Sequence, residues 1–177
     1  MYNWPVPDSY NKELPEKGHT GSFWEKREGL FNCGIHIYAP ENSEVETIDE
    51  GRVISVSKFT DHDISPILGN TRYVIIRTNN VFVKYGGLKD IIVKPGDIVA
   101  PGQKIGTIGS ILNGRTNLNL EEEVLYQNLE KGGRNYLHLE ILKPPIHEIK
   151  PYFVGFFLFD QKPFSLIDPN IFLKSLS

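Results

Sequence analysis

The chain has 177 residues, of which 40% are hydrophobic and 23% are charged, and its formal net charge is -3. This length and composition provide enough apolar surface for one folded domain and differ from those of a disordered protein. The slight negative charge gives no electrostatic basis for binding nucleic acid or an anionic membrane. Cys33 is the single cysteine, so a disulfide within the chain is excluded, which suits a reducing compartment.

The N-terminal residues carry no targeting signal that we can identify. Residues 1–8 lack both the basic start and the apolar stretch of a secretory signal peptide. The most apolar run, Phe153–Phe159, is far shorter than the ~20 residues that a membrane-spanning helix needs. We therefore expect a cytoplasmic protein without a membrane span, and we expect Phe153–Phe159 to form a buried strand.

Short strands separated by turns dominate the sequence. Residues 72–78 and 81–85 have the composition of strands, and Asn79-Asn80 between them predicts a tight hairpin. Glycines such as Gly96 and Gly102 stand where the chain is expected to reverse. The pattern predicts an all-β fold, built as an antiparallel sandwich or barrel.

Two short helices are predicted within this pattern. Residues 119–131 begin with Asn119, which favours the cap position, continue with acidic residues, and stop before Gly132-Gly133. The apolar face of this segment comprises Val124, Leu125 and Leu129. A second helix is predicted near the C-terminus, where Asp168 caps the start and Pro169 takes the first helical position.

The order of several motifs resembles the lysostaphin and LytM-type zinc metallopeptidases, which have the duplicated-hybrid-motif fold. That family has a His-x-Gly-x-Asp motif, then Ala-Pro, Gly-Arg-Val, Tyr-x-His-Leu, a glycine hairpin and a final His-x-His. The corresponding segments of this chain are Asn32–His36, Ala39-Pro40, Gly51–Val53, Tyr85–Leu88, residues 93–106 and Tyr136–His138. The resemblance covers about residues 21–142 with an insertion at about 112–134. We expect one domain, 1–177, in which residues 143–177 form a C-terminal extension packed on this core.

The glycine-rich run at 93–106 also resembles the hairpin of biotinyl and lipoyl carrier domains. Such a carrier needs a lysine at a tight, exposed turn between hydrophobic residues, and the sequence has none in that setting. The order of the other motifs favours the peptidase family.

The resemblance assigns three metal-ligand positions. Asn32 stands at the first ligand histidine, His36 at the ligand aspartate, and His138 at the last ligand histidine. An amide oxygen is a poor zinc ligand, whereas imidazole is a common one. The implied metal ligands are His36 and His138, with Asn32 as a poor third. No cofactor is expected, although zinc remains possible.

Two further positions would carry the family's catalytic histidines. Gly87 replaces the histidine of Tyr-x-His-Leu, and Tyr136 replaces the first histidine of His-x-His. Glycine has no acid-base group, and a phenol rarely acts as a base near neutral pH. Glu140 either orients His138 or is a solvated strand residue. His36 and His138 are also compatible with ordinary strand histidines bonded to neighbouring backbone.

Two functions are consistent with these positions. In the first, the domain has no catalytic residues and its former cleft binds a peptide, glycan or protein partner. The residues expected to line that groove are Asn32, Cys33, Tyr85, Gly87, Tyr136 and Glu140, with Trp24 nearby. In the second, His36 and His138 still hold zinc, and the domain is a metalloendopeptidase acting on cell-wall peptides, with Tyr136 as oxyanion donor.

Overall fold

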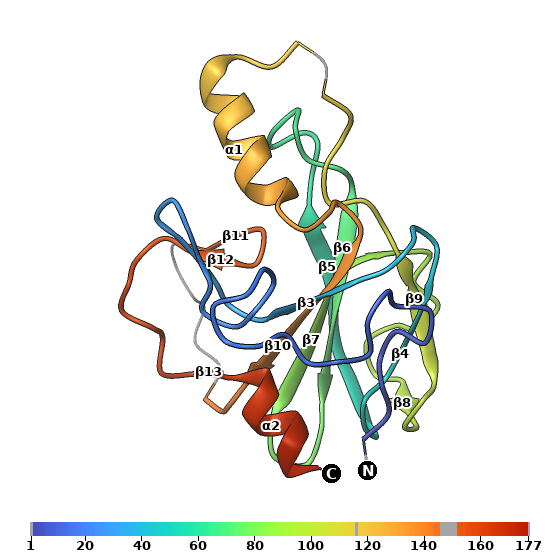
Figure 1. Ribbon diagram of the computed structural model, residues 1–177. Helices are drawn as coiled ribbons and strands as arrows, with labels where there is room; N and C mark the ends of the chain where they lie inside the picture. Colours follow the sequence, from blue (N-terminus) through green and yellow to red (C-terminus); the bar gives the residue numbers. More distant parts are fainter. Residues whose placement is uncertain (1, 116, 146–151, 177) are drawn as a thin grey trace.

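The computed structural model describes residues 2–115, 117–145 and 152–176. Antiparallel strands form a nine-stranded and a four-stranded sheet, and two short helices lie at opposite ends of the larger sheet (Figure 1). This architecture confirms the predicted all-β, antiparallel fold with two short helices. The predicted C-terminal extension is described except for 146–151 and 177.

Four long strands form the body of the larger sheet. β5 (Gly51–Thr60), β6 (Thr71–Arg77) and β7 (Phe82–Lys89) are antiparallel neighbours. β6 and β7 form the hairpin predicted at Asn79-Asn80. On its other side β7 pairs with β10 (Tyr136–Leu142), in which all seven residues are buried.

β10 is the strand that positions the candidate site. Along one edge of β10, the first half of the strand pairs with β3 (Ile35–Tyr38) and the last two residues pair with β13 (Leu166–Ile167). The opposite edge pairs with β7. His138 lies where the pairings overlap, opposite His36 on β3 and opposite Gly86 on β7.

The predicted glycine hairpin at 93–106 has a different pairing. β8 (Ile98–Val99) pairs with β5, whereas β9 (Lys104–Ile108) pairs with β4 (Glu44–Glu46) and with β7. Gly102, in the turn between β8 and β9, has a φ of 73°, which glycine adopts at little cost. The two strands therefore join different neighbours across the fold instead of each other.

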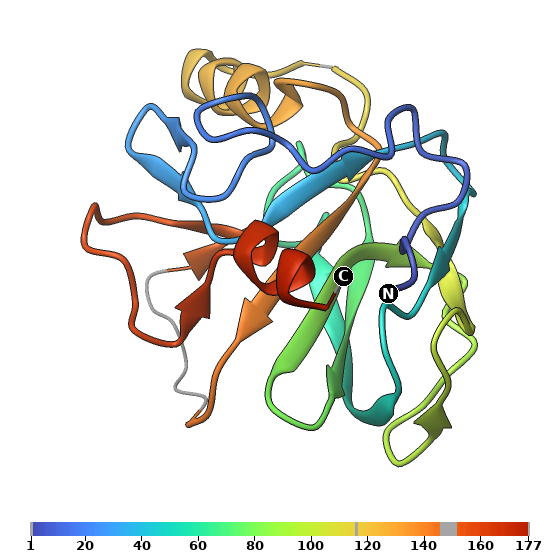
Figure 2. The same cartoon turned by 60° about the horizontal axis from the view of Figure 1, so that its bottom comes forward.

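The four-stranded sheet joins the C-terminal segment to the N-terminal part of the chain. Its order is β1 (Lys26–Arg27), β2 (Leu30–Asn32), β12 (Phe156–Phe157) and β11 (Tyr152–Phe153). The single strand predicted for Phe153–Phe159 is wrong, because the chain reverses at Val154-Gly155, where both φ angles are positive. Figure 2 shows the resulting β11–β12 hairpin, in orange-red, beside the blue β1–β2 hairpin.

The first predicted helix is α1 (Leu120–Glu130). Its start is a capping box, in which Asn119 Oδ1 accepts from the Glu122 backbone N–H and Glu122 Oε2 accepts from the Asn119 backbone N–H, both at 2.9 Å. The buried residues of α1 are Tyr126 and Leu129. Val124, which was predicted on the apolar face, is 44% exposed.

The second predicted helix is α2 (Pro169–Ser175), and it packs near β10. Oδ1 of Asp168 accepts from the backbone N–H of Asn170 at 2.9 Å, so Asp168 is the predicted cap. Within the described part of the chain, neither helix has the length and apolar character needed to cross a bilayer.

Gly34 lies where the chain between β2 and β3 touches β10. A Cβ atom at Gly34 would lie 2.2 Å from the carbonyl oxygen of Leu139 and 3.1 Å from Cγ of Glu140. Real Cβ atoms do not approach a backbone oxygen this closely, so only glycine fits at this position. The glycine of the first sequence motif therefore has a structural role that is independent of metal binding.

Gly34→Ala is expected to lower the free energy of unfolding by about 1–3 kcal/mol, because the added methyl group would push β10 away. Gly114→Ala is a matched control, since a Cβ there meets nothing within 4 Å, and its effect should stay within about 0.5 kcal/mol. Urea denaturation followed by circular dichroism measures both values. Equal stabilities of the two variants would contradict this close packing.

Candidate functional site

The two histidines predicted as metal ligands are neighbours in one buried cluster. The ring centroids of His36 and His138 are 5.1 Å apart, and the residues are 3% and 0% exposed. The ring of Tyr136 stacks on that of His36 with a centroid distance of 4.0 Å. Glu140 follows on the same face of β10 because side chains alternate along a strand. The structure thus brings together four of the predicted site residues.

Glu140 determines which nitrogen of His138 carries hydrogen. Burial alone raises the Glu140 pKa, but the Lys84 ammonium and the hydrogen bond from His138 outweigh burial and lower the pKa to about 2. An ionised carboxylate only accepts, so Nε2 of His138 donates to Oε1 of Glu140 at 2.8 Å, and Nδ1 keeps a lone pair. Burial lowers the pKa of His138, so the ring is neutral and this contact is a hydrogen bond.

Tyr38 determines the tautomer of His36 in a similar way. The Tyr38 hydroxyl donates to the backbone oxygen of Lys131 at 3.1 Å. Its oxygen therefore accepts from Nδ1 of His36 at 3.4 Å, which leaves the lone pair on Nε2. Burial, followed by the neighbouring His138, holds the His36 pKa well below 6.5. His36 is consequently neutral as well.

Three polar atoms of the cluster have no hydrogen-bond partner among the described residues. They are Nε2 of His36, Nδ1 of His138 and the hydroxyl of Tyr136. The two nitrogens belong to neutral imidazoles, which is the form in which histidine binds metal. Burial raises the pKa of Tyr136, so its phenol keeps its hydrogen. The cluster therefore presents two lone pairs and one hydroxyl group.

Asn32 does not complete a metal site. Its Nδ2 donates to the backbone oxygen of Ser22 at 3.0 Å, and its Oδ1 accepts from the backbone N–H of Gly34 at 3.3 Å. Within residues 2–115, 117–145 and 152–176, no group of three or more His, Cys, Asp or Glu side chains is arranged to hold a metal. The residues present therefore do not fit a zinc centre with three protein ligands.

The β11–β12 hairpin covers the cluster. Gly155 lies against the face of the His138 ring, since a Cβ at Gly155 would be 2.5 Å from Cε1 and 2.7 Å from Nε2. Phe156 meets the His36 ring edge-on, with centroids 5.8 Å apart. The backbone N–H of Cys33 donates to the Gly155 oxygen at 2.8 Å. The chain's own C-terminal segment thus occupies the face where a cleft was expected.

The residues predicted to line a groove are all buried. They are Asn32, Cys33, Tyr85, Gly87, Tyr136 and Glu140. Tyr85 is not part of the cluster, because it packs in the main core and its hydroxyl accepts from the Ile48 backbone N–H at 3.0 Å. Gly87 has a φ of 84°, and a Cβ there would lie 2.7 Å from the Tyr136 oxygen. A role of these six residues in ligand binding stays a prediction.

Two residues beside the first motif also pack as core residues. Cys33 is buried among Leu142, Phe157 and Leu166, and burial raises the pKa of its thiol. Trp24 stacks on Phe31 with a centroid distance of 5.1 Å, away from the histidine cluster. Both side chains therefore contribute to the packing of the small core cluster between the first motif and the C-terminal segment.

Lys84 and Tyr152 complete the polar network, and the sequence analysis missed both. Nζ of Lys84 lies 3.5 Å from Oε1 of Glu140 and donates to the Tyr152 hydroxyl at 2.5 Å. The Tyr152 hydroxyl donates to the same carboxylate oxygen. The pairing of β7 with β10 offers a signal for Lys84, which is the register partner of Glu140. Tyr152 comes from β11, and no motif marks it.

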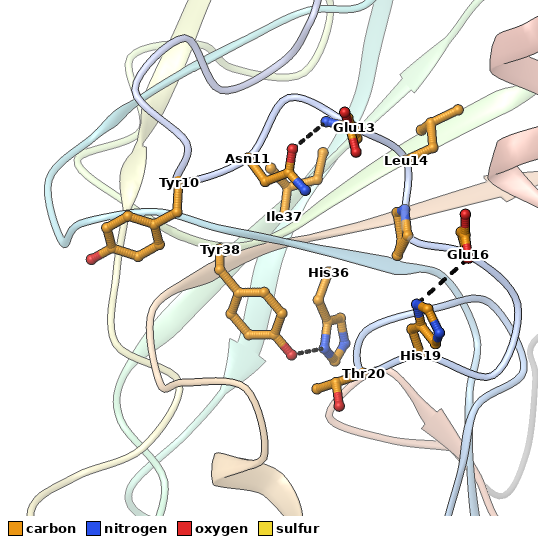
Figure 3. A pocket seen from close by; sticks show the side chains of 11 residues that line it. Tyr10, Asn11, Glu13, Leu14, Glu16, His19, Thr20, His36, Ile37 and Tyr38 are labelled. Carbon is orange, nitrogen blue, oxygen red and sulfur yellow. Dashed lines mark hydrogen bonds and ion pairs between the residues drawn. The ribbon is translucent and has the colours of Figure 1, made fainter.

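A cavity of about 460 Å³ lies beside the cluster, between the N-terminal segment and β3 (Figure 3). Figure 3 shows Tyr10 and Tyr38 toward one side and Glu16 with His19 toward the other, with His36 between them. Tyr10 is 73% exposed, and Nδ1 of His19 is 3.9 Å from Oε2 of Glu16. The cavity thus combines aromatic rings with charged and polar groups.

The fold and the motif order agree with a family assignment. The model of peptidase family M23 matches residues 30–143, which is more than half of the chain. The chain therefore belongs to peptidase family M23. A comparison with curated proteins found no match.

Several solved structures have a similar fold. CbpA from L. salivarius REN has a TM-score of 0.58 at 18% identity, over 99% of this chain and 95% of that chain. The catalytic domain of lysostaphin from Staphylococcus simulans has a TM-score of 0.51 at 17% identity, over 98% and 92%. A zinc-containing peptidase from Vibrio cholerae is 26% identical with a TM-score of 0.48, over 76% of this chain and 37% of that chain. The chain thus spans less than half the length of that peptidase.

Low pH is expected to destabilise the folded protein because it protonates the ionisable groups of the histidine cluster. Unfolded histidine takes up a proton below about pH 6.5, whereas His36 and His138 have lower pKa values in the folded state, so stability falls as the pH drops below 6.5. Glu140, with a folded pKa of about 2 against an ordinary 4.5, adds a further loss as the pH falls from 4.5 toward 2.

The urea midpoint measured between about pH 7.5 and pH 5 tests this expectation. His36→Gln should flatten the dependence below pH 6.5, because one buried neutral imidazole is removed. His19→Gln is the control, since its side chain is 70% exposed, and it should keep the wild-type slope. A His36→Gln slope equal to that of the wild type would refute the assignment.

Proposed function

We propose that this chain is a non-hydrolytic member of peptidase family M23 that binds a peptide, a glycan or a segment of a protein partner. The composition of the histidine cluster carries the proposal. His36 and His138 are neutral, and the amide of Asn32 is engaged by backbone groups. The nearby Glu140 carboxylate already binds His138, Lys84 and Tyr152.

The positions of the family's remaining histidines support the same proposal. Hydrolysis at a zinc centre needs a metal-bound water and groups that move protons or stabilise the oxyanion. Gly87 offers no side chain, and Tyr136 keeps its proton because burial raises its pKa. Gly155 lies on the His138 ring, so a scissile peptide has no access to that face.

The cavity beside β3 supports binding of a polar chain. Tyr10 and Tyr38 provide aromatic surfaces for sugar rings or peptide planes, and Glu13 and Glu16 provide hydrogen-bond acceptors. Concave sites with aromatic walls and a few polar groups are typical of ligand binding. The cavity is therefore the proposed binding position, in place of the cleft that the β11–β12 hairpin covers.

The alternative is a zinc metalloendopeptidase that acts on cell-wall peptides. Two observations favour this alternative. Nε2 of His36 and Nδ1 of His138 each have an unpartnered lone pair, and neutral imidazole is a common zinc ligand. The two histidines are also register partners on the paired strands β3 and β10. Under this alternative Tyr136 donates to the oxyanion, and His138→Ala abolishes metal binding and turnover together.

Untagged protein equilibrated with zinc and then dialysed is expected to hold far less than one zinc per chain. It is also expected to leave glycine-rich and cell-wall peptides uncut, because the cluster supplies two ligands and no base. Plasma mass spectrometry measures the metal, and peptide mass spectrometry measures cleavage, with the lysostaphin catalytic domain as the active reference. One zinc per chain, with cleavage that His138→Ala abolishes, would establish the alternative.

Tyr10→Ala is expected to weaken the sedimentation of this protein with purified bacterial cell wall by several-fold, since aromatic contacts contribute about 0.5–1.5 kcal/mol. Its side chain is largely exposed, so the variant should fold normally. Phe164→Ala removes an aromatic residue that is 78% exposed and does not line the cavity, and it should bind like the wild type. The same loss in both variants would exclude the cavity as the binding site.

A further inference from the structure

Lys84 is a buried cation inside the polar network of the site. The residue is 8% exposed, and the rings of Tyr152, Tyr73 and Phe59 surround its ammonium group with centroid distances of 4.1, 4.9 and 5.5 Å. Lysine is rarely buried unless a partner compensates its charge. Here the compensation comes from Glu140, 3.5 Å away, and from the Tyr152 hydroxyl.

Glu140 connects this cation to His138. In metal centres a ligand histidine usually donates its second ring N–H to a carboxylate, which orients the ring and makes the ligand nitrogen more basic. The pair of His138 and Glu140 has this arrangement, with Nε2 bonded to the carboxylate and Nδ1 unpartnered among the described residues. In this chain the same carboxylate oxygen also contacts the ammonium group of Lys84.

The charges of the cluster already balance. The negative charge of Glu140 cancels the positive charge of Lys84, and the imidazoles of His36 and His138 are neutral. A divalent cation between these imidazoles would add two positive charges to a buried site without an anion to offset them, which is costly in a medium of low polarity. The position of Lys84 thus opposes the binding of a metal next to His138.

We propose that Lys84 is a built-in cation that replaces a metal as the partner of the Glu140–His138 pair and keeps divalent metals out of this site. The inference rests on the proposed non-hydrolytic function and explains how the site remains paired without a metal. Lys84 acts through Glu140 and is therefore a positioning residue. It follows that removal of the Lys84 charge should raise the affinity of the site for zinc.

Isothermal titration of the full chain with zinc chloride tests this inference. Lys84→Met removes the cation and leaves Glu140 to support His138. The zinc affinity is expected to rise about 10- to 100-fold over the wild type, the range typical of changes to groups that orient a metal ligand. Addition of zinc at one fixed concentration should raise the melting temperature of Lys84→Met relative to the same variant without zinc, and should leave the melting temperature of the wild type unchanged.

Three further variants control for folding and for charge. Lys84→Gln removes the charge but keeps a hydrogen-bond donor for Tyr152, so it serves if Lys84→Met does not fold, and it should show the same rise. Lys89→Met removes a lysine of the same strand that pairs with Glu41 at 2.7 Å, and it should match the wild type. The double variant Lys84→Met/Glu140→Gln lacks the carboxylate too, and its zinc affinity should return to that of the wild type.

Folded Lys84→Met or Lys84→Gln with the zinc affinity of the wild type would overturn the inference. An increase in Lys89→Met or in the double variant as large as that in Lys84→Met would also overturn it. These results are distinct from a failure of the proposed function. That function fails if the wild type itself holds one zinc and cleaves peptide, whereas the role of Lys84 is judged on differences between variants.

Discussion

The buried carboxylate of Glu140 is the interaction on which the site depends. Glu140 is 1% exposed, and an ionised carboxylate at such a position requires several partners. It receives them from β10 itself through His138, from β7 through Lys84 and from the C-terminal hairpin through Tyr152. One side chain therefore fixes a histidine tautomer, binds a lysine and holds the segment that covers the cleft.

The strands around the site pair regularly with the residues that this chain has at the motif positions. β3, β7 and β10 pair in a regular register although Asn32, His36 and Gly87 occupy positions that the family resemblance assigns to other residues. Gly34, which permits the contact with β10, is the part of the first motif that matches the family. Backbone packing alone accounts for a glycine at this position.

Local signals made most of the fold predictable. The cap at Asn119, the turn at Asn79-Asn80 and the proline after Asp168 each depend on neighbouring residues alone, and each element forms where the sequence indicates. The strand pairing of residues 93–106 was wrong because β8 and β9 join partners that are distant in sequence. No local pattern carries that information.

The candidate site was predictable only in part for the same reason. The motifs brought His36, Tyr136, His138 and Glu140 to one place, and the structure agrees. Tyr85 was assigned from a motif, and alternation along β7 directs its side chain to the main core and its neighbour Lys84 to the cluster. Tyr152 and Gly155 reach the cluster because β12 pairs with β2, which is more than 120 residues earlier in the sequence. No local pattern could therefore reveal that the C-terminal segment lies over the histidines.

The pairing of β12 with β2 has a consequence for synthesis of the protein. A ribosome releases the chain from its N-terminus, so β2, β3 and β10 emerge before β11 and β12 exist. During that interval the edge of β2 has no neighbour on the β12 side, and an unpaired strand edge can recruit strands from other molecules. The nascent chain therefore exposes this strand edge until β11 and β12 have emerged, and truncation before Tyr152 would leave the edge exposed permanently.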